Sequence, residues 1–372
     1  MRQRSDGNLK QTQKISSLQL FFFILQSQVG ISVLSMPHAI FRIAKTDSWL
    51  VVILSGLFVQ ILIFILWLLA KRFPDNTIFE VQEELLGKTL GKLLTIAYSI
   101  YFILSTSIIL VLFSDIIKLW LLPTTPGWII TLLMLSISVY MVKENLRILS
   151  RFFVITAIFF LFFFILSLYS FKYANVLYIL PIGKEGFFSI LKGSREGIRP
   201  FQGVEMLLIL FPYVQATAIT KLKAITYANI CTTFLYTVLT VSCIVFFSPK
   251  ELLLIPQPVL YVIKSFELSI IERPDILFTS SWIIIVASTV MSFLYATSKG
   301  MTYVLSYSRK TFTYWGALVI YIITIVCHQP SAVHFLSKLV SSCVLIFAVG
   351  IPIVLLILAI ILKKSGQPGE FS

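Results

Sequence analysis

The sequence predicts an all-α integral membrane protein with about ten transmembrane helices. Hydrophobic residues make up 58% of the 372 residues and charged residues only 12%, whereas a soluble protein typically carries about 25% charged residues. Apolar stretches of about 20 residues, the length that crosses a bilayer, recur along the whole chain. We therefore expect residues 1–372 to form a single polytopic membrane domain.

Ten apolar segments are predicted to span the membrane. They are residues 15–41, 49–70, 93–117, 127–143, 152–171, 198–220, 224–247, 276–298, 311–327 and 339–362. The second and fifth segments contain no charged residue, while the fourth and ninth are short. The sixth contains a glutamate, which a membrane span rarely carries without a reason.

The basic residues predict the orientation of these spans. The net charge is +14, but the Lys and Arg side chains are scattered among short loops, a pattern that reports topology rather than a nucleic-acid ligand. If the N-terminus is cytoplasmic, the short external loops are nearly free of basic residues. We therefore expect both termini to be cytoplasmic, with an amphipathic cytoplasmic helix over 77–94 and external segments at 173–197 and 252–271.

The first span is predicted to be broken. Gln26 and Gln28 precede Gly30, and Pro37 follows seven residues later. Gly30 lacks side-chain restraint, and Pro37 cannot donate a hydrogen bond to the preceding turn. Unwound backbone at membrane depth requires protein or a water-filled cavity to satisfy it. Taken alone, the same residues also fit an ordinary proline-kinked helix.

The sixth span repeats this pattern, because Gly203 precedes Pro212. With ten spans, the first and sixth are corresponding members of two five-helix halves. Matched interruptions in corresponding helices are typical of inverted-repeat transporters whose binding site lies at the midplane. We therefore predict a five-plus-five inverted repeat, about 15–171 and about 198–362, with helices 1 and 6 broken.

Glu205 lies deep in the predicted sixth span. Eight residues separate it from Gly197, about 12 Å along a helix, and an ionised carboxylate at that depth costs at least about 2.5 kcal/mol by insertion scales. It must be paired, protonated or exposed to water. Glu205 could therefore be a proton site or a partner for a cationic ligand group. It could also cap backbone that the break leaves free, and both roles could hold together.

Nothing in the sequence predicts an enzyme or a cofactor. It contains no phosphate-binding glycine loop, no HExxH motif and no Ser/His/Asp set that would converge on one face. The four cysteines lie in or beside apolar runs without CxxC spacing. We therefore expect no catalytic residue, no metal site and no cofactor. Hydroxyls in the eighth span, such as Ser288 and Thr289, could bind sodium, but could equally bond to helix backbone.

Four motifs, taken in order and spacing, resemble those of the spore germination protein family over essentially the whole chain. They are QVG at 28–30 with Leu34 and Pro37, ELLGKTLG at 84–91, PFQGVE at 200–205 with Phe211 and Pro212, and IERPD at 271–275 with Trp282. This family contains the B subunits of nutrient germinant receptors and belongs to the amino acid–polyamine–organocation transporter superfamily.

The resemblance implies a LeuT-like fold and a receptor that works with a larger A subunit and a C-subunit lipoprotein in the spore inner membrane. It also implies a binding site between the unwound parts of helices 1 and 6, flanked by the third and eighth helices. The site residues implied in this way are Gly30, Ile31, Ser32, Gly203, Val204 and Glu205.

The leading functional hypothesis is therefore a germinant receptor B subunit that binds a small nutrient. An amino-acid zwitterion would suit free helix N-termini at its anionic end and a carboxylate at its cationic end. The alternative is a stand-alone proton-coupled amino-acid symporter in which Glu205 carries the proton. A third hypothesis is a scaffold or ion-conducting subunit that binds no nutrient.

Overall fold

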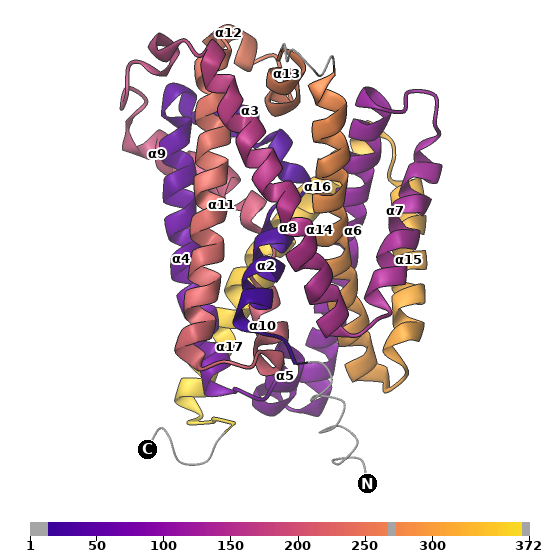
Figure 1. Ribbon diagram of the computed structural model, residues 1–372. Coiled ribbons are helices and arrows are strands. Elements are labelled where there is room, and N and C mark those ends of the chain that lie inside the picture. The colour runs from indigo at the N-terminus through magenta and orange to yellow at the C-terminus, as the bar shows by residue number, and fades with distance from the viewer. Residues whose placement is uncertain (1–13, 267–272, 367–372) are drawn as a thin grey trace.

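The computed structural model describes residues 14–266 and 273–366, which fold into a bundle of helices (Figure 1). Within these ranges no β-strand is present, and Ile15 and Val214 form an isolated parallel β-bridge. The first half of the bundle contains α2 (Ser17–Gln28), η1 (Ile31–Leu34), α3 (Met36–Ala44), η2 (Lys45–Asp47), α4 (Ser48–Arg72), α5 (Ile78–Leu86), α6 (Lys88–Trp120), α7 (Gly127–Val142) and α8 (Leu146–Tyr169).

The second half begins with short elements and continues with long helices. They are η3 (Ser170–Tyr173), η4 (Val176–Ile179), α9 (Gly186–Gly197), η5 (Arg199–Phe201), α10 (Met206–Leu210), η6 (Phe211–Tyr213), α11 (Ala218–Phe246), α12 (Pro249–Leu252), α13 (Pro258–Lys264), α14 (Pro274–Leu305), α15 (Arg309–Val326), α16 (Pro330–Val344), the π-helical turn η7 (Leu345–Gly350) and α17 (Ile351–Ile361).

Six helical stretches of the described chain are long and apolar enough to cross a membrane. They are Met36–Arg72, Lys88–Trp120, Leu146–Tyr173, Ala218–Phe246, Pro274–Leu305 and Pro330–Ile361. Gly127–Val142 is a shorter apolar helix. These helices confirm the prediction of an all-α, multi-pass membrane protein.

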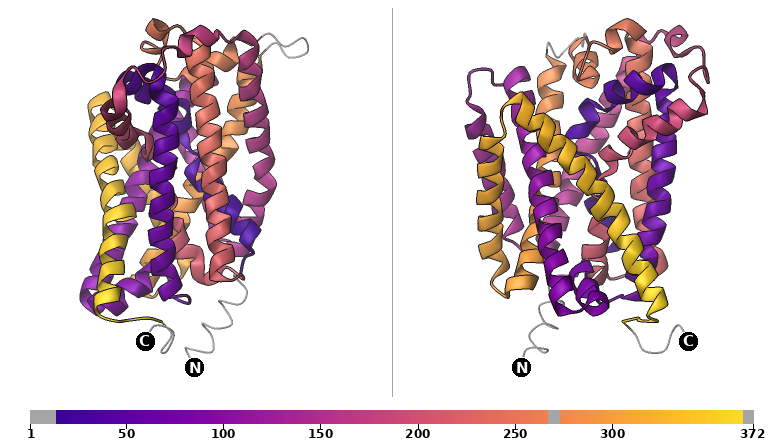
Figure 2. Two further views of the ribbon diagram at one scale, coloured as in Figure 1. Left: turned by 90° about the vertical axis from the view of Figure 1, so that its left-hand side faces the viewer. Right: turned by 180° about the vertical axis from the view of Figure 1, so that it is seen from behind.

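Helices α6 and α14 pack against each other at the centre of the bundle, and α2 packs against α8, α11 and α14. By contrast, α16 and α17 run obliquely across the outside, as the right-hand view of Figure 2 shows. On α8 the outward-facing residues Ile155, Leu161 and Ile165 are exposed. An apolar outer surface of this kind is what lipid tails require of a spanning helix.

The external segment predicted before the sixth span contains a helix, α9. Helix α9 packs against α3 and α4, and its buried glycines face the latter. A Cβ at Gly193 would lie 2.9 Å from Cγ2 of Val51, and one at Gly197 would lie 2.3 Å from Oγ of Ser55. Small residues let two helix backbones approach closely. Helical structure in this region therefore begins at Gly186, earlier than the predicted position 198.

The two ends of the bundle differ in their short helices. Helix α5 lies at the end where α17 finishes, whereas α12 and α13 lie at the opposite end (Figure 1). The predicted amphipathic helix over 77–94 is divided at Gly87, whose φ of +84° ends α5 before α6 begins. Residues 267–271 of the predicted external segment lie outside the described residues.

Candidate functional site

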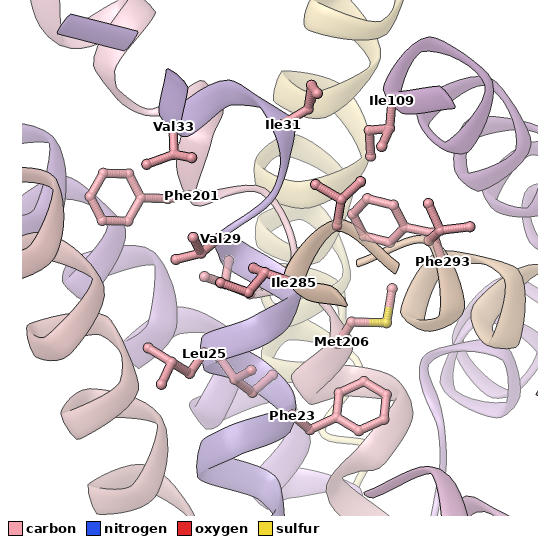
Figure 3. Close-up of a cluster of buried hydrophobic side chains, with 14 of the residues drawn as sticks. Phe23, Leu25, Val29, Ile31, Val33, Ile109, Phe201, Met206, Ile285 and Phe293 are labelled. Atoms are coloured by element: carbon pink, nitrogen blue, oxygen red, sulfur yellow. The ribbon is translucent and has the colours of Figure 1, made fainter. Parts of the chain in front are cut away.

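Two interrupted helical segments meet inside the bundle. In the first, α2 ends at Gln28 and is followed by η1 and then by α3. In the second, η5 ends at Phe201, the chain turns through 202–205, and α10 begins at Met206. The segments are lined on their inner side by apolar residues from both, together with Ile109 of α6 and Phe293 of α14 (Figure 3).

The prolines of the two segments occupy positions that begin a helical element. Pro37 lies in the first turn of α3 and Pro212 in the first turn of η6. At such positions the missing N–H of proline costs no hydrogen bond, because the first N–H groups of a helix have no intrahelical partner. Both prolines therefore fit a chain that restarts a helix.

Gly203 is the point at which the second segment touches the first. Its φ is +115°, and an added Cβ would lie 2.6 Å from the carbonyl oxygen of Ser27. A residue with a side chain is disfavoured at this φ and would also collide with backbone, which cannot move aside. Glycine at this position therefore allows the two interrupted segments to pack in direct contact.

The carboxylate of Glu205 holds the turn that Gly203 begins. The side chain is buried, with 2% of its surface exposed. Its Oε2 accepts a hydrogen bond from the backbone N–H of Gly203 at 2.8 Å, and its Oε1 accepts one from the hydroxyl of Tyr101 at 2.7 Å. Of the two roles that the sequence left open for Glu205, this geometry provides the partners that a backbone cap needs.

Gln202 extends this network toward α6. Its side-chain Nε2 donates to the hydroxyl oxygen of Tyr101 and to Oγ of Ser105, each at 2.9 Å. The two amide hydrogens thus have separate acceptors. Because Tyr101 accepts from Gln202 and donates to Glu205, a continuous chain of hydrogen bonds fixes the turn at 202–205 against the middle of α6.

The first segment is held by hydroxyls from α11 and α14. Tyr236 donates to the carbonyl oxygens of Gln28 and Pro200, each at 3.0 Å, and so joins the two segments. Thr289 donates to the carbonyl oxygen of Gln26 at 2.9 Å. Carbonyls at the end of α2 would otherwise lack partners, and unwound backbone at this depth must be satisfied by protein or water.

The hydroxyl of Thr289, one of those considered for sodium, is therefore engaged by backbone. The hydroxyl of Ser288 likewise donates to the carbonyl oxygen of Ile284 at 3.1 Å. In the described part of the chain, no group of three or more His, Cys, Asp or Glu side chains is placed to hold a metal ion.

Three adjoining cavities lie along these segments. The innermost measures about 30 Å³ and is lined by Gly30, Gln202 and Phe293, among others. The next measures about 190 Å³ and shares Ile31, Ser32, Ile109, Arg199, Pro200 and Gln202 with the first. The outermost measures about 300 Å³. Arg199 lines all three. We refer to them as the inner, middle and outer cavities.

The implied site residues fall into two groups. Gly30, Ile31 and Ser32 line the inner cavity. Gly203, Val204 and Glu205 are buried beside it and line none of the three cavities in the described part of the chain. The two breaks lie together, but they contribute differently to the space between them.

Eight further residues that line the inner cavity were not assigned to the site from the sequence, namely Ser27, Gln28, Ile109, Arg199, Pro200, Gln202, Thr289 and Phe293. Gln202 lies within the PFQGVE motif and Arg199 directly precedes it, so the motif itself was the signal that could have identified them. Ile109 and Phe293 lie on the long helices α6 and α14, where an apolar residue gives no local sign of the face that it occupies.

The chain matches the sequence model of a family described as "Spore germination protein" over residues 14–333. It is 27% identical to spore germination protein GerQB of Bacillus cereus over 328 residues, 87% of this chain and 89% of that protein. It is 26% identical to spore germination protein YndE of Bacillus subtilis (strain 168) over 355 residues, covering 94% and 97%.

The fold is similar to that of MhsT, a LeuT-fold transporter whose crystal structure was solved in complex with L-phenylalanine. The TM-score is 0.65 at 14% identity, and the match covers 95% of this chain and 90% of that one. Since the family model covers more than half of the sequence, the chain belongs to the spore germination protein family.

Proposed function

We propose that this protein is the B-type subunit of a nutrient germinant receptor and binds a small nutrient, foremost an amino acid, in the inner and middle cavities. The observation that carries the proposal is the position of these cavities. Both interrupted segments, α6 and α14 contribute to their walls, and intramembrane cavities between interrupted helices are where transporters of this kind bind substrate.

The helices are assigned to ten spans in a five-plus-five inverted repeat. Helices α2 and α3 form the broken first helix, while α9, η5 and α10 form the broken sixth. The repeats cover about 15–171 and about 198–362, and α9 adds the outer part of the helix that begins the second repeat. All ten spans belong to one membrane domain over 1–372.

Within the site, Gly30, Ile31 and Ser32 contact the ligand. Gly203, Val204 and Glu205 lie behind the opposite wall and support it, because Glu205 fixes the turn that presents Gln202 to the cavities. Pro37 and Pro212 restart the helices after the breaks. In this arrangement, binding would change the packing between the two interrupted segments without any chemical conversion of the nutrient, so the protein acts as a receptor and not as an enzyme.

The receptor operates in the spore inner membrane with both termini cytoplasmic. It works with a larger A subunit and a C-subunit lipoprotein, to which it transmits the conformational change. Membership of the spore germination protein family and the names of the relatives support this assignment.

The alternative of a stand-alone proton-coupled amino-acid symporter is favoured by one observation, the similarity of fold to the transporter MhsT. Uptake of labelled amino acids into vesicles that contain only this protein, driven by an imposed proton gradient, would support the symporter. A ligand that binds but does not accumulate would support the receptor.

The proposal is tested by blocking the cavities. Ser32 lines the inner and middle cavities and is partly exposed to them, so Ser32→Phe fills the space with little demand on the surrounding core. Binding of amino acids, sugars and nucleosides to the purified protein in lipid nanodiscs is measured by displacement of labelled ligand. We expect at least one compound to bind and Ser32→Phe to abolish that binding.

The matched control is Ser136→Phe, at an exposed position of α7 away from these cavities. It makes the same chemical change, and we expect its binding to equal that of the unaltered protein. Normal binding to Ser32→Phe, or failure of every compound to bind to the unaltered protein, would contradict the proposal.

A further inference from the structure

The outer cavity is strongly basic. It is lined by four cationic side chains, Lys192, Arg195 and Arg199 from the α9–η5 segment and Lys338 from α16, and by one acidic side chain, Glu196. Lys192, Arg195 and Lys338 form no ion pair with any residue in the described ranges. A concave surface lined by one sign of charge concentrates field lines and raises the local concentration of counter-ions.

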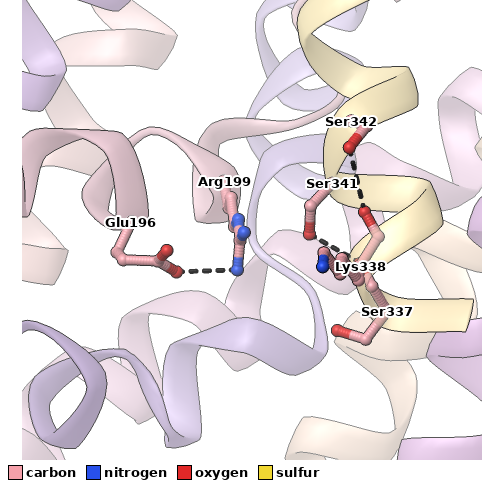
Figure 4. A network of polar contacts seen from close by, with 6 residues as sticks. All are labelled: Glu196, Arg199, Ser337, Lys338, Ser341 and Ser342. Carbon is pink, nitrogen blue, oxygen red and sulfur yellow. Dashed lines mark hydrogen bonds and ion pairs between the residues drawn. The ribbon is translucent and has the colours of Figure 1, made fainter. Parts of the chain in front are cut away.

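Arg199 and Glu196 form an ion pair within this cavity (Figure 4). Nη1 of Arg199 lies 2.7 Å from Oε2 of Glu196, and the two side chains are 40% and 30% exposed. A guanidinium has five N–H donors in a planar fork, so this contact leaves donors that a second carboxylate can reach. Exposed ion pairs of this kind contribute little stability.

The hydroxyls that face this pair do not supply the anion donors. Ser341 donates to the carbonyl oxygen of Ser337 at 2.6 Å, and Ser342 donates to that of Lys338 at 3.2 Å. Their hydroxyl hydrogens are engaged by their own helix, as is common for serine in membrane helices. Hydrogen-bond donation into the outer cavity therefore comes from the cationic groups.

Arg199 is also the only one of these charged residues that reaches the inner cavity in the described part of the chain. Glu196 lines the outer and middle cavities but not the inner one. A ligand that travels from the outer cavity to the inner one therefore passes Arg199 throughout its path, and Glu196 over the outer part.

We propose that the basic residues of the outer cavity recognise the carboxylate of a nutrient that occupies the adjoining inner and middle cavities, and that the nutrient bound by this protein therefore carries a carboxylate. Arg199 holds the carboxylate, Lys338 attracts it from the opposite wall, and Glu196 accepts the ammonium group when the ligand is an amino acid. This inference rests on the proposed nutrient-binding function and narrows its substrate class. An uncharged sugar or nucleoside would gain nothing from these charges.

The test compares ligands with and without the carboxylate. The purified protein in nanodiscs is titrated with the L-amino acids, with the corresponding amino-acid amides, and with glucose and inosine as uncharged nutrients. We expect amino acids to bind and their amides to bind roughly ten- to a hundredfold more weakly, the loss that corresponds to one charge-assisted hydrogen bond. The preference should decrease at high salt, since the outer residues are exposed.

Two variants locate this preference in the outer cavity. Lys338→Gln should weaken amino-acid binding several-fold and reduce its salt dependence, and Arg199→Lys should weaken it further, because lysine keeps the charge but loses the fork. Lys184→Gln removes a positive charge at an exposed position just before α9 that lines none of these cavities. We expect it to leave both the affinity and the salt dependence unchanged.

The outcomes separate this inference from the proposed function. Suppose that glucose or inosine binds, that Ser32→Phe abolishes this binding, and that Lys338→Gln and Arg199→Lys do not change the affinity for amino acids. The carboxylate proposal is then overturned, while nutrient binding stands. If no compound binds to the unaltered protein, both fail. Equal weakening by Lys184→Gln and Lys338→Gln would mean that total surface charge, and not the outer cavity, produces the preference.

Discussion

Tyr101 donates its hydroxyl hydrogen to the carboxylate of Glu205 across 2.7 Å, which joins the middle of α6 to the turn between η5 and α10. The same carboxylate accepts the N–H of Gly203 from within that turn. One buried acid thereby fixes both the local conformation of the second interrupted segment and its position against a central helix. Buried charge is expensive in a membrane and is retained where it is fully hydrogen-bonded.

The first prediction concerns the two oxygens of Glu205. Glu205→Ala leaves the N–H of Gly203 and the hydroxyl of Tyr101 without their acceptor, at about 1–3 kcal/mol for each buried unsatisfied group. We expect a lower protein level in membranes and a lower midpoint of thermal unfolding. Glu205→Gln keeps one amide oxygen as an acceptor, so we expect an intermediate loss and a nutrient dose–response curve close to that of the unaltered protein.

A different result would give Glu205 a direct role. If Glu205→Gln is present at a normal level but needs a more than tenfold higher nutrient concentration for half-response, the charge itself takes part in binding or proton transfer. Membrane immunoblots measured beside each dose–response curve distinguish these outcomes.

The second prediction compares the two glycines. At Gly203, whose φ is +115°, an added Cβ would lie 2.6 Å from the backbone oxygen of Ser27. At Gly30, whose φ is −123°, it would lie 3.2 Å from Oγ1 of Thr289, a side-chain atom. Left-handed strain alone costs about 1–2 kcal/mol. We expect Gly203→Ala to reduce protein level and thermal stability much more than Gly30→Ala.

Gly30→Ala should instead act on binding, because Gly30 lines the inner cavity and the added methyl group takes space there. Fluorescence-detected size-exclusion chromatography after graded heating measures the stability of each variant, and ligand titration measures its affinity. Equal thermal stability of the two alanine variants would mean that Gly203 does not need its left-handed conformation.

The sequence features that predict interruptions in the first and sixth spans are local. Gly30, Gly203 and the two following prolines act through their own backbone restrictions, which do not depend on neighbours far along the chain. The same is true of the apolar runs that form the long helices. The apolar runs predicted the all-helical, multi-pass fold class, whereas Gly30, Ile31 and Ser32 were implied by the family resemblance and remain proposed ligand contacts.

Features that depend on contacts between distant segments could not be predicted. Gln202 and Tyr101 are about a hundred residues apart in sequence, and no local pattern pairs them. Helix α9, which precedes the predicted sixth span, was not predicted, because charged residues such as Lys192 and Glu196 interrupt its apolar pattern. Their charges face the outer cavity, and the helix is recognisable only once the close packing of Gly193 on Val51 is seen.

The third prediction tests the orientation of the bundle. If the end that carries α12 and α13 is external and the end that carries α5 is cytoplasmic, single cysteines at Lys184 and Lys88 lie on opposite sides of the membrane. Both positions are exposed. In a background lacking Cys231, Cys243 and the other two native thiols, we expect an impermeant maleimide to label Lys184→Cys in intact cells and Lys88→Cys only after permeabilisation. The reverse pattern would invert the topology.

The last prediction concerns Tyr236, whose hydroxyl contacts the carbonyl oxygens of Gln28 and Pro200 and so links both interrupted segments to α11. Tyr236→Phe retains the edge-on packing against Phe201, whose ring centroid lies 5.2 Å away, and removes only the hydroxyl. Two buried carbonyls then lose a donor, and we expect the free energy of unfolding to fall by about 1–3 kcal/mol, seen as a lower midpoint of thermal unfolding.

Because the link restrains the segments relative to each other, added nutrient should raise that midpoint more in Tyr236→Phe than in the unaltered protein, as ligand contacts replace the missing restraint. Tyr227→Phe, at an exposed position of the same helix, serves as the control and should leave the midpoint unchanged. If Tyr236→Phe also leaves it unchanged, the two segments are held together by their direct contact at Gly203 and Ser27 alone.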